Sequence, residues 1–371
     1  MVSPMENMAR GTARFASYHD AVEAIFNEPW CDGLPIVPPT AELVDKMIAA
    51  GGLSGEHVLG ALPGRGLSLQ VWQAATCAVM AGCRPDYFPV VLASWDALLD
   101  PRFNLHAAIS STGGAGFAAV VSGPYALTIG MNSGTGLFGS GNRANATIGR
   151  SIRLGVMSAF KAVSGELDAG SFGHGGKYSF HFAESPPPKP WRSIREQLGF
   201  PATATTVTVM PAEAPRQIMH RMKPSADDML RTLASPMRDP SQNGTCTDST
   251  YIVAIGPEHT GVLVEAGLTQ RQVREGISRY SALNVAEVAY AGQRIERPPP
   301  RYQAPDASGR IDNSPPEHIL VVTAGGHGAG WSAVIPSWTW ARHSLPVTKA
   351  VQLPGAAPVT RNAAACELDF A

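Results

Sequence analysis

Neither sign of charge dominates this 371-residue sequence: 29 Lys and Arg stand against 30 Asp and Glu, a formal net charge of −1. The sequence also lacks a basic run of the kind that follows a phosphate backbone, so we expect no nucleic-acid partner. No apolar stretch approaches the roughly 18 residues that a membrane span needs, and the N-terminal residues contain no apolar signal-peptide core. We therefore expect a cytoplasmic protein without a membrane segment.

Cysteine is scarce, and the common local signatures of chemistry are missing. Five cysteines, an odd number spread along the chain, predict no disulfide framework. The sequence has no C-x-x-C, no H-E-x-x-H, no P-loop and no G-x-S-x-G elbow. Cys77 and Cys83 do not share a helical face, so we expect two buried thiols there. Cys246, in a polar turn before a strand, is either a reactive thiol or an inert one.

The sequence does contain enough apolar material for a sizeable core, with 44% hydrophobic and 16% charged residues. Its 38 glycines and 31 prolines predict many tight turns. The length favours two domains. We place their boundary at "SPPPKPW", which gives an N-terminal α+β domain over 1–185 and a C-terminal α/β domain over 186–371. A Pro-rich linker is expected near 296–317.

Hydrophobic periodicity predicts the elements of both parts. In the first part, helices are expected over 17–29, 41–50, 68–82, 87–100 and 144–160, and β-type segments over 116–123 and 125–131. In the second part, three strands alternate with helices, which predicts a smaller layer of mostly parallel strands. These strands fall in 205–218, 249–259 and 318–331, and the helices in 224–234, 260–266 and 269–279.

Residues 177–183 alternate as a half-buried strand does. The aromatic side chains would face the core (Tyr178, Phe180 and Phe182). The polar ones would face a pocket (Lys177, Ser179 and His181).

The stretch "GMNSGTGLFGSGNRANATIGR" (130–150) places small and amide-bearing residues just before a helix. Its G-x-G-x-x-G pattern lies too far from the helix start for a dinucleotide fingerprint, so we do not expect NAD. A helix N-terminus and an arginine fork suit a carboxylate or phosphate, which makes Arg143 a candidate ligand-binding residue together with the asparagines (Asn132, Asn142 and Asn145). The alternative is that these side chains only tie the loop to the protein.

Several histidines stand where loops meet strand ends, and two or three could converge on one pocket. The candidates for acid–base or ligand roles are His106, His181, His259 and His327, with Glu184, Glu258 and Lys177 beside them. A divalent metal held by His106, His181 and His259 is possible, but sequence spacing does not establish it.

Nearly the whole chain resembles the large companion proteins of bacterial UGSC-motif selenocysteine/cysteine proteins. The matching strings are "DGLPIVPPT" (32–40), "AVMAGCRPDYFPVVLA" (78–93), "FNLHA" (103–107), "GMNSG" (130–134), "FGSGNRANATIGRSIRL" (138–154), "GKYSFHFAE" (176–184), "GPEH" (256–259) and "VVTAGG" (321–326). The resemblance implies a cytoplasmic bacterial protein that works beside a thiol or selenol redox partner. Because this chain has no C-G-S-C motif, redox chemistry would come from that partner. Position 181 is a histidine here where similar proteins often have cysteine.

Two hypotheses follow. The first is an enzyme, or a substrate-binding enzyme subunit, that acts on a small polar and anionic molecule by thiol-linked reduction or bond cleavage. Its catalytic groups would be His106, His259, Glu184 and Lys177, and its ligand-binding groups Asn132, Asn142, Arg143, Asn145, His181 and His327. The second is a non-catalytic binding or scaffolding subunit of a redox complex, whose Gly-rich loops dock a UGSC-type partner protein. A homo- or hetero-oligomer is compatible with either hypothesis. A concave site with converging side chains would favour the enzyme.

Overall fold

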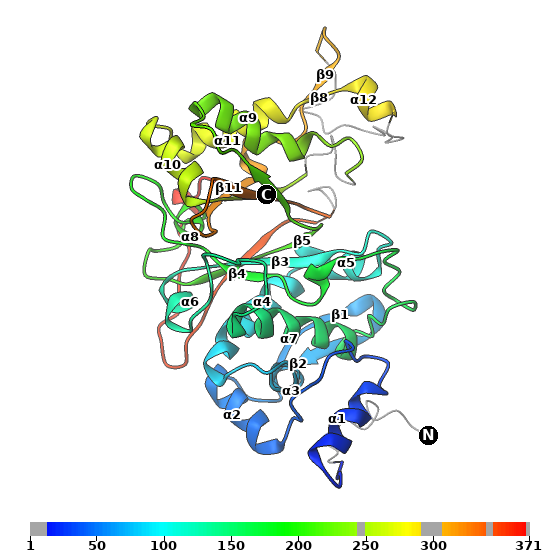
Figure 1. Cartoon of the computed structure of the whole chain (residues 1–371). Coiled ribbons are helices and arrows are strands. Elements are labelled where there is room, and N and C mark those ends of the chain that lie inside the picture. The colour runs from blue at the N-terminus through cyan, green and yellow to red at the C-terminus, as the bar shows by residue number, and fades with distance from the viewer. Residues whose placement is uncertain (1–12, 243–248, 291–305, 339–343, 369–371) are drawn as a thin grey trace.

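The computed structural model describes residues 13–242, 249–290, 306–338 and 344–368. Two four-stranded sheets lie face to face, and helices cover the outer face of each, which gives four layers (Figure 1). The predicted α/β class is confirmed. Within the described ranges, no helix is long and apolar enough to cross a membrane.

The first sheet has the strand order β12-β5-β3-β4. Its central strand β3 (Gly116–Ser122), buried throughout, pairs in parallel with β4 (His181–Ala183) and antiparallel with β5 (Thr206–Ala212). At the edge, β12 (Val347–Ala350) pairs antiparallel with β5. The helices of this half are α2 (Ala41–Gly51), α3 (Val71–Ala81), α4 (Phe88–Leu99) and α7 (Arg143–Ala159).

The second sheet has the order β10-β7-β11-β6. Its strands are β6 (Arg216–Met219), β7 (Tyr251–Ile255), β10 (Ile319–Thr323) and β11 (Trp331–Pro336), and its helices are α9 (Ala226–Ala234), α10 (Pro257–Glu265) and α11 (Gln270–Ser281). Only β7 and β10 are parallel neighbours. The expectation of mostly parallel strands is therefore wrong, because the loop from β10 to β11 is too short for a crossover helix and returns the chain antiparallel.

Smaller elements complete the described chain. They are α1 (Tyr18–Phe26), β1 (Val58–Leu62), β2 (Leu67–Gln70), α5 (Leu105–Ser110), α6 (Pro124–Thr128), α8 (Ile194–Gln197), β8 (Leu283–Asn284), α12 (Val285–Tyr290) and β9 (Arg310–Ile311). The Pro-rich linker expected near 296–317 lies partly outside the described residues.

Apart from the short elements α8, β8, α12 and β9, both sheets are built by the same succession of elements. The first half runs β3, α6, α7, β4, β5, and the second runs β7, α10, α11, β10, β11. In each half the helix after the first strand begins with Gly-Pro, at Gly123 and Gly256. A Cβ at either glycine would clash with a carbonyl oxygen near the start of the third strand, Ala204 or Trp331. The likeness thus extends to a close backbone approach that only glycine permits.

The two halves exchange their edge strands. After β5 the chain crosses to the second sheet as β6, and after β11 it crosses to the first sheet as β12. The predicted boundary at 185/186 therefore does not separate the sheets, since the first sheet takes β5 and β12 from the later part of the chain. The Pro-rich segment 185–191 is a connection within one structure.

Apolar residues form a separate core in each interlayer space. The largest lies between the first sheet and its helices. A second fills the space between the sheets and includes Phe180, Phe182, Ile252 and Ile335. A third lies between the second sheet and α9, α10 and α11. Because both faces of the strands are covered, strands such as β3 and β7 consist of continuous apolar runs, as buried strands do.

The predicted helices of the first part are confirmed with small boundary changes. Thr40 caps α2 through the amide of Leu43, and Gly52 ends it in the left-handed conformation. The β-type reading of 125–131 is wrong: Pro124 starts the short helix α6 there. The strand expected over 177–183 is also wrong at its start, where residues Gly175–Lys177 form a 3-10 helix.

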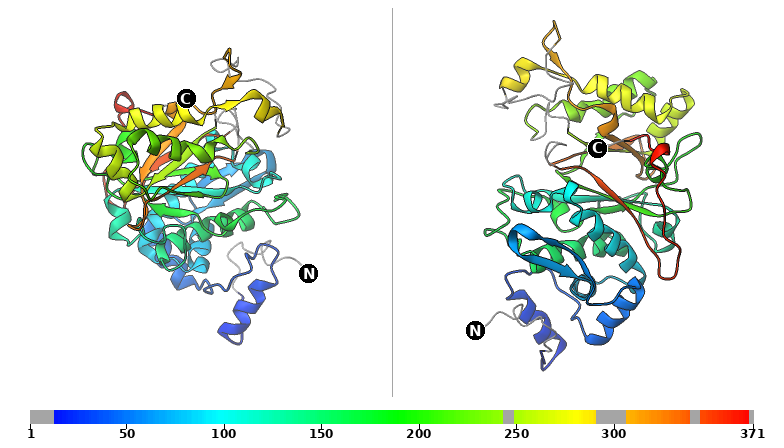
Figure 2. Two further views of the ribbon diagram at one scale, coloured as in Figure 1. Left: turned by 45° about the horizontal axis from the view of Figure 1, so that its top comes forward. Right: turned by 180° about the vertical axis from the view of Figure 1, so that it is seen from behind.

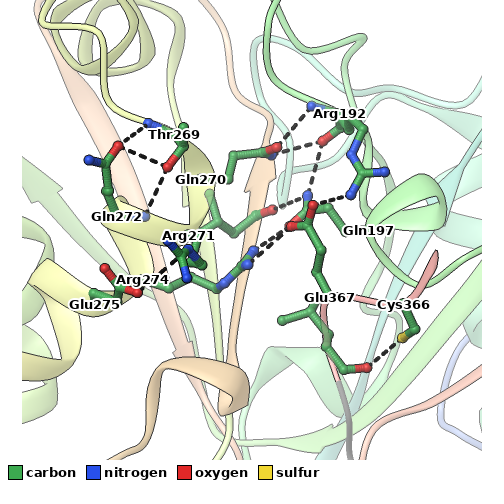
Figure 3. A network of polar contacts seen from close by, with 12 residues as sticks. Arg192, Gln197, Thr269, Gln270, Arg271, Gln272, Arg274, Glu275, Cys366 and Glu367 are labelled. Atoms are coloured by element: carbon green, nitrogen blue, oxygen red, sulfur yellow. Dashed lines mark hydrogen bonds and ion pairs between the residues drawn. The ribbon is translucent and has the colours of Figure 1, made fainter. Parts of the chain in front are cut away.

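The C-terminal segment ties the two halves together. After β12 it runs beside the helical layer of the first half, where Pro354 contacts Gly52, and then returns to the second half (Figure 2). There Glu367 forms ion pairs with Arg192 and Arg274, and Arg274 Nη1 also donates to Gln197 Oε1 at 2.7 Å (Figure 3). Arg274 is buried, so its two acceptors compensate for the lost hydration of its charge.

Candidate functional site

Two Gly-rich loops from different halves enclose a cavity of about 490 Å³ at one end of the space between the sheets. Residues 134–139 come from the loop before α7, and residues 324–328 from the loop between β10 and β11. The lining residues are Gly134, Thr135, Gly136, Leu137, Phe138, Gly139, Gln217, Ala254, Ala324, Gly325, Gly326, His327, Gly328, Trp331, Ser332 and Ala333. The volume suits a small molecule.

The asparagines of the 130–150 stretch hold this loop in shape. Asn145 Oδ1 accepts from the Asn132 amide at 2.9 Å, and its Nδ2 donates to the Asn132 carbonyl at 3.0 Å. Asn142 caps α7 by accepting from the Asn145 amide, and its Nδ2 donates to Gly130 O. Their side-chain amides are used within the loop, so they form the support of the cavity and are absent from its lining.

Arg143 begins α7, as expected of a residue at the helix start. Its Nε donates to the carbonyl oxygen of Gly82 at 2.9 Å, and Arg143 is not a lining residue of the cavity. The contacts therefore favour the alternative in which Arg143 ties the loop to the first half.

Close contacts join the two loops. The Gly325 amide donates to Ser133 O at 2.8 Å. Beside it, Ser185 and Thr323, at the carboxyl ends of β4 and β10, are linked by two hydrogen bonds, of 2.8 and 2.6 Å. A Cβ at Gly326 would lie 2.6 Å from Thr135 Cα, which is closer than real Cβ contacts.

Replacing Gly326 with alanine is expected to push the two loops apart and lower the free energy of unfolding by about 1–3 kcal/mol, the usual cost of overpacking. Gly134→Ala is the matched control, because the nearest atom to a Cβ there is 3.7 Å away. Urea unfolding of both variants measures the difference. Equal stabilities would contradict the close contact between the loops.

His327 stands at the cavity with a carboxylate behind it. Its Nδ1 lies 3.5 Å from Glu258 Oε1, and Glu258 is on the first turn of α10. The same oxygen accepts from the Gly328 amide at 2.9 Å. That hydrogen bond is the main reason why the pKa of Glu258 is lowered, so the carboxylate is ionised at neutral pH. An imidazole with one nitrogen beside a carboxylate and the other free is the arrangement of an acid–base pair.

His259, also on α10, has a different environment from His327. It is buried, its Nδ1 is 2.7 Å from Ser332 Oγ, and its Nε2 faces the His220 carbonyl oxygen at 3.3 Å. Ser332 Oγ also accepts from the Gly256 amide. Burial lowers the pKa of His259, so it is neutral near pH 7. The two ring nitrogens join α10 to β11 and to the residue that follows β6, and His259 is absent from the cavity lining.

His181 and Glu184 are buried rather than facing a pocket. His181 Nε2 lies 3.2 Å from Ser94 Oγ, and its Nδ1 has no partner among the described residues. Glu184 accepts from the Ser122 hydroxyl at 2.5 Å and from the Ile194 amide at 2.9 Å. The pocket-facing role predicted for His181 is wrong, because helices α4 and α7 cover that face of β4.

The remaining candidates lie elsewhere. His106 is exposed on α5, and Figure 1 places α5 far from α10. Lys177 lies in a separate pocket, described below. Among the described residues, no group of three or more His, Cys, Asp or Glu could hold a metal ion, so His106, His181 and His259 do not form one. Cys246 lies outside the described residues, and Cys77 and Cys83 are buried as expected.

The candidate residues predicted from the sequence do not include four side chains that line the cavity: Thr135, Gln217, Trp331 and Ser332. Gln217 lies on β6, the exchanged edge strand, opposite Ala333 of β11. No local pattern marks it, because its position at the cavity depends on the crossing of the chain between the sheets. Thr135 could have been found from its place inside the Gly-rich loop.

The chain matches no family model and no curated protein at a significant level.

Proposed function

We propose that this protein is an enzyme, or the substrate-binding subunit of one, that holds a small polar molecule between the two sheets and cleaves a bond in it by proton transfer through His327. The observation that carries the proposal is the convergence of two Gly-rich loops, one from each half, on a concave cavity whose lining includes the largely exposed imidazole of His327, 3.5 Å from an ionised carboxylate. A flat Gly-rich surface would instead have favoured a scaffolding role.

Glu258 would act through His327. Its carboxylate, fixed by the Gly328 amide, favours a proton on Nδ1 and leaves Nε2 free to accept a proton from the ligand. On returning that proton to the leaving group, the imidazole would be restored. This sequence of transfers belongs to lyase or hydrolase chemistry.

The residues that line the cavity indicate which class of ligand it would bind. It contains no Lys or Arg among the described residues, whereas Leu137, Phe138 and Trp331 supply apolar walls. The side chains of Thr135 and Gln217 can donate and accept hydrogen bonds. An anionic group would depend on loop amides alone, so this cavity suits an uncharged polar molecule better than the anion first expected. It also contains no cysteine in the described lining, so thiol-linked chemistry would need a thiol from the substrate or a partner protein.

Turnover by the purified protein tests the proposal. We expect wild-type protein, incubated with a bacterial small-molecule extract, to deplete at least one compound and accumulate its cleavage product, as followed by mass spectrometry. His327→Gln should abolish this change, and Glu258→Gln should slow it by about 10-fold or more, a usual range for acid–base residues and their partners. His106→Gln is the matched control, because this exposed histidine lies away from the cavity.

A turnover that survives His327→Gln would reject the proton-transfer role. If no compound changes with wild-type protein, a thermal-shift comparison decides on binding: a compound from the extract should raise the Tm of wild type and leave that of Gln217→Trp, which fills the cavity, unchanged. Equal shifts in both proteins would reject the cavity as the binding site.

A further inference from the structure

We infer that the first half carries a second ligand site, a pocket that binds a singly charged carboxylate with an apolar body. The pocket has a volume of about 340 Å³ and shares no lining residue with the cavity between the sheets. It is lined by Cys31, Asp32, Arg153, Met157, Ser164, Gly170, Phe172, Gly173, His174, Lys177 and Tyr178. The inference does not depend on the proposed enzymatic function.

Two cations that line this pocket meet at one buried carboxylate beside it, that of Asp168. Lys177 Nζ lies 2.8 and 2.6 Å from the two oxygens of Asp168, and Arg153 Nη2 donates to Oδ2 at 2.8 Å. Asp168 is 4% exposed and Arg153 10%. Burial raises the pKa of Asp168, but hydrogen bonds from Lys177 and Arg153 outweigh it and lower the pKa, so the carboxylate stays ionised. One anion therefore fixes two cations in place.

The charged side chains joined by these contacts carry a net positive charge. Asp32, the carboxylate that lines the pocket, already receives two hydrogen bonds from Arg150, at 2.6 and 2.9 Å. Burial lowers the pKa of His174, whose Nδ1 accepts from the Gly176 amide, so this ring adds no charge at neutral pH. Three cations thus stand against two carboxylates, and one negative charge from a ligand would complete the balance.

Arg153 has donors available for that ligand. Only its Nη2 is used within the described residues, although the side chain is nine-tenths buried and lines the pocket. The guanidinium presents five N–H donors in a planar fork, so Nε and Nη1 remain for an oxyanion. Lys177, which lines the same pocket, adds the rest of its ammonium group.

Aromatic side chains beside these cations define the rest of the ligand. Phe172 is 101% exposed and Tyr178 52% exposed, and Met157 lies deeper in the wall. Covering a fully exposed phenylalanine with an apolar group is favourable, because it removes apolar surface from water. A small carboxylate with an apolar ring or chain therefore fits both the charge and the rim, whereas an inorganic dianion would use the cations alone.

Benzoate is a suitable probe, with benzamide as its uncharged counterpart and sulfate as an anion without an apolar body. Titration calorimetry on the full chain should give benzoate binding that is at least tenfold tighter than either comparison. Lys177→Met should weaken benzoate about tenfold or more, and Phe172→Ala should weaken benzoate but not sulfate. Lys46→Met is the matched control, since Lys46 is an exposed lysine paired only with Glu42.

Alkylation of Cys31 locates the binding. This partly exposed thiol lines the pocket, whereas Cys366 lies elsewhere and serves as an internal reference. Benzoate should slow iodoacetamide modification of Cys31 and leave that of Cys366 unchanged, as measured by peptide mass spectrometry. This readout and Phe172→Ala remain available if Lys177→Met does not fold.

Several outcomes would overturn the inference. They are equal binding of benzamide and benzoate, equal benzoate affinity of Lys177→Met and Lys46→Met, sulfate binding as tight as that of benzoate, or no protection of Cys31. None of them bears on His327, so failure here and failure of the proposed function are separate results.

Discussion

Replacing Phe182 with alanine is expected to lower the free energy of unfolding by about 3–5 kcal/mol, the range for a fully buried phenylalanine. The Phe182 side chain has no solvent exposure and lies in the core between the sheets. Its ring meets that of Phe138 edge to face, with centroids 5.2 Å apart. The change would leave an empty volume where two rigid sheets cannot close over it.

Phe182→Ala should also alter the cavity between the loops, because Phe138, whose ring packs on that of Phe182, lines it. Phe172→Ala is the matched control for stability: it deletes the same side chain from a fully exposed position and should change the free energy by less than about 0.5 kcal/mol. Urea unfolding followed by circular dichroism measures both variants. A loss below 1 kcal/mol for Phe182→Ala would show that the sheets do not pack as described.

Replacing His181 with leucine is expected to make the protein relatively more resistant to acid. Burial lowers the pKa of His181 to about 3, whereas an unfolded histidine has a pKa near 6.5. As the pH falls below about 6.5, the unfolded state takes up a proton that the native state does not. Native stability therefore decreases, by roughly 2–3 kcal/mol between pH 7 and pH 4.5.

Leucine is a suitable replacement, because it puts an apolar side chain of similar size, without a titratable group, into the buried site of His181. Ser94 would keep a partner, since its hydroxyl already donates to Val90 O at 2.9 Å. The difference in unfolding free energy between His181→Leu and wild type should move by about 2–3 kcal/mol in favour of the variant over this pH range. A difference independent of pH would mean that His181 is accessible to protons.

For Glu184 we expect the opposite dependence of stability on pH. Burial raises its pKa to about 7, against the lowering effects of the Ser122 hydroxyl and the Ile194 amide. The native state then holds a proton that the unfolded state releases above about pH 4.5, so this group adds stability as the pH falls from 7 to 4.5. Glu184→Gln removes that gain. In wild type, the effects of His181 and Glu184 on stability between pH 7 and pH 4.5 have opposite signs. Each effect is therefore measured by comparing its single variant with wild type.

Helix positions were predictable because their signals are local. Thr40, Asn142 and Gly52 act within a few residues of the backbone groups that they satisfy or release, so their roles can be recognised in the sequence. The burial of Phe180 and Phe182 followed from alternation in the same way. Tyr178 was assigned to the core wrongly, because the chain there is a 3-10 turn and period-two reasoning does not apply.

The roles of polar residues were harder to predict, because the sequence does not show which elements cover each face of a strand. His181 lies on the face of β4 opposite to Phe182, as predicted, but α7 covers that face so closely that Gly149 has no room for a Cβ beside His181. Likewise Asn142, Arg143 and Asn145 lie at the helix start, as expected. Whether their polar groups bind a ligand or the chain itself depends on distant partners such as Gly82 O.

The sequence by itself thus determined the α/β class, the helices with their caps, and a Gly-rich loop that needs unusual backbone angles, because each of these depends on neighbours along the chain. Tertiary structure alone decided the exchange of β6 and β12, the meeting of two Gly-rich loops, and the separation of His327 with Glu258 from Lys177 with Arg153. The exchange of the strands and the meeting of the loops depend on contacts between residues more than a hundred positions apart, which pair through the crossing of the chain between two sheets and leave no periodic trace in the sequence.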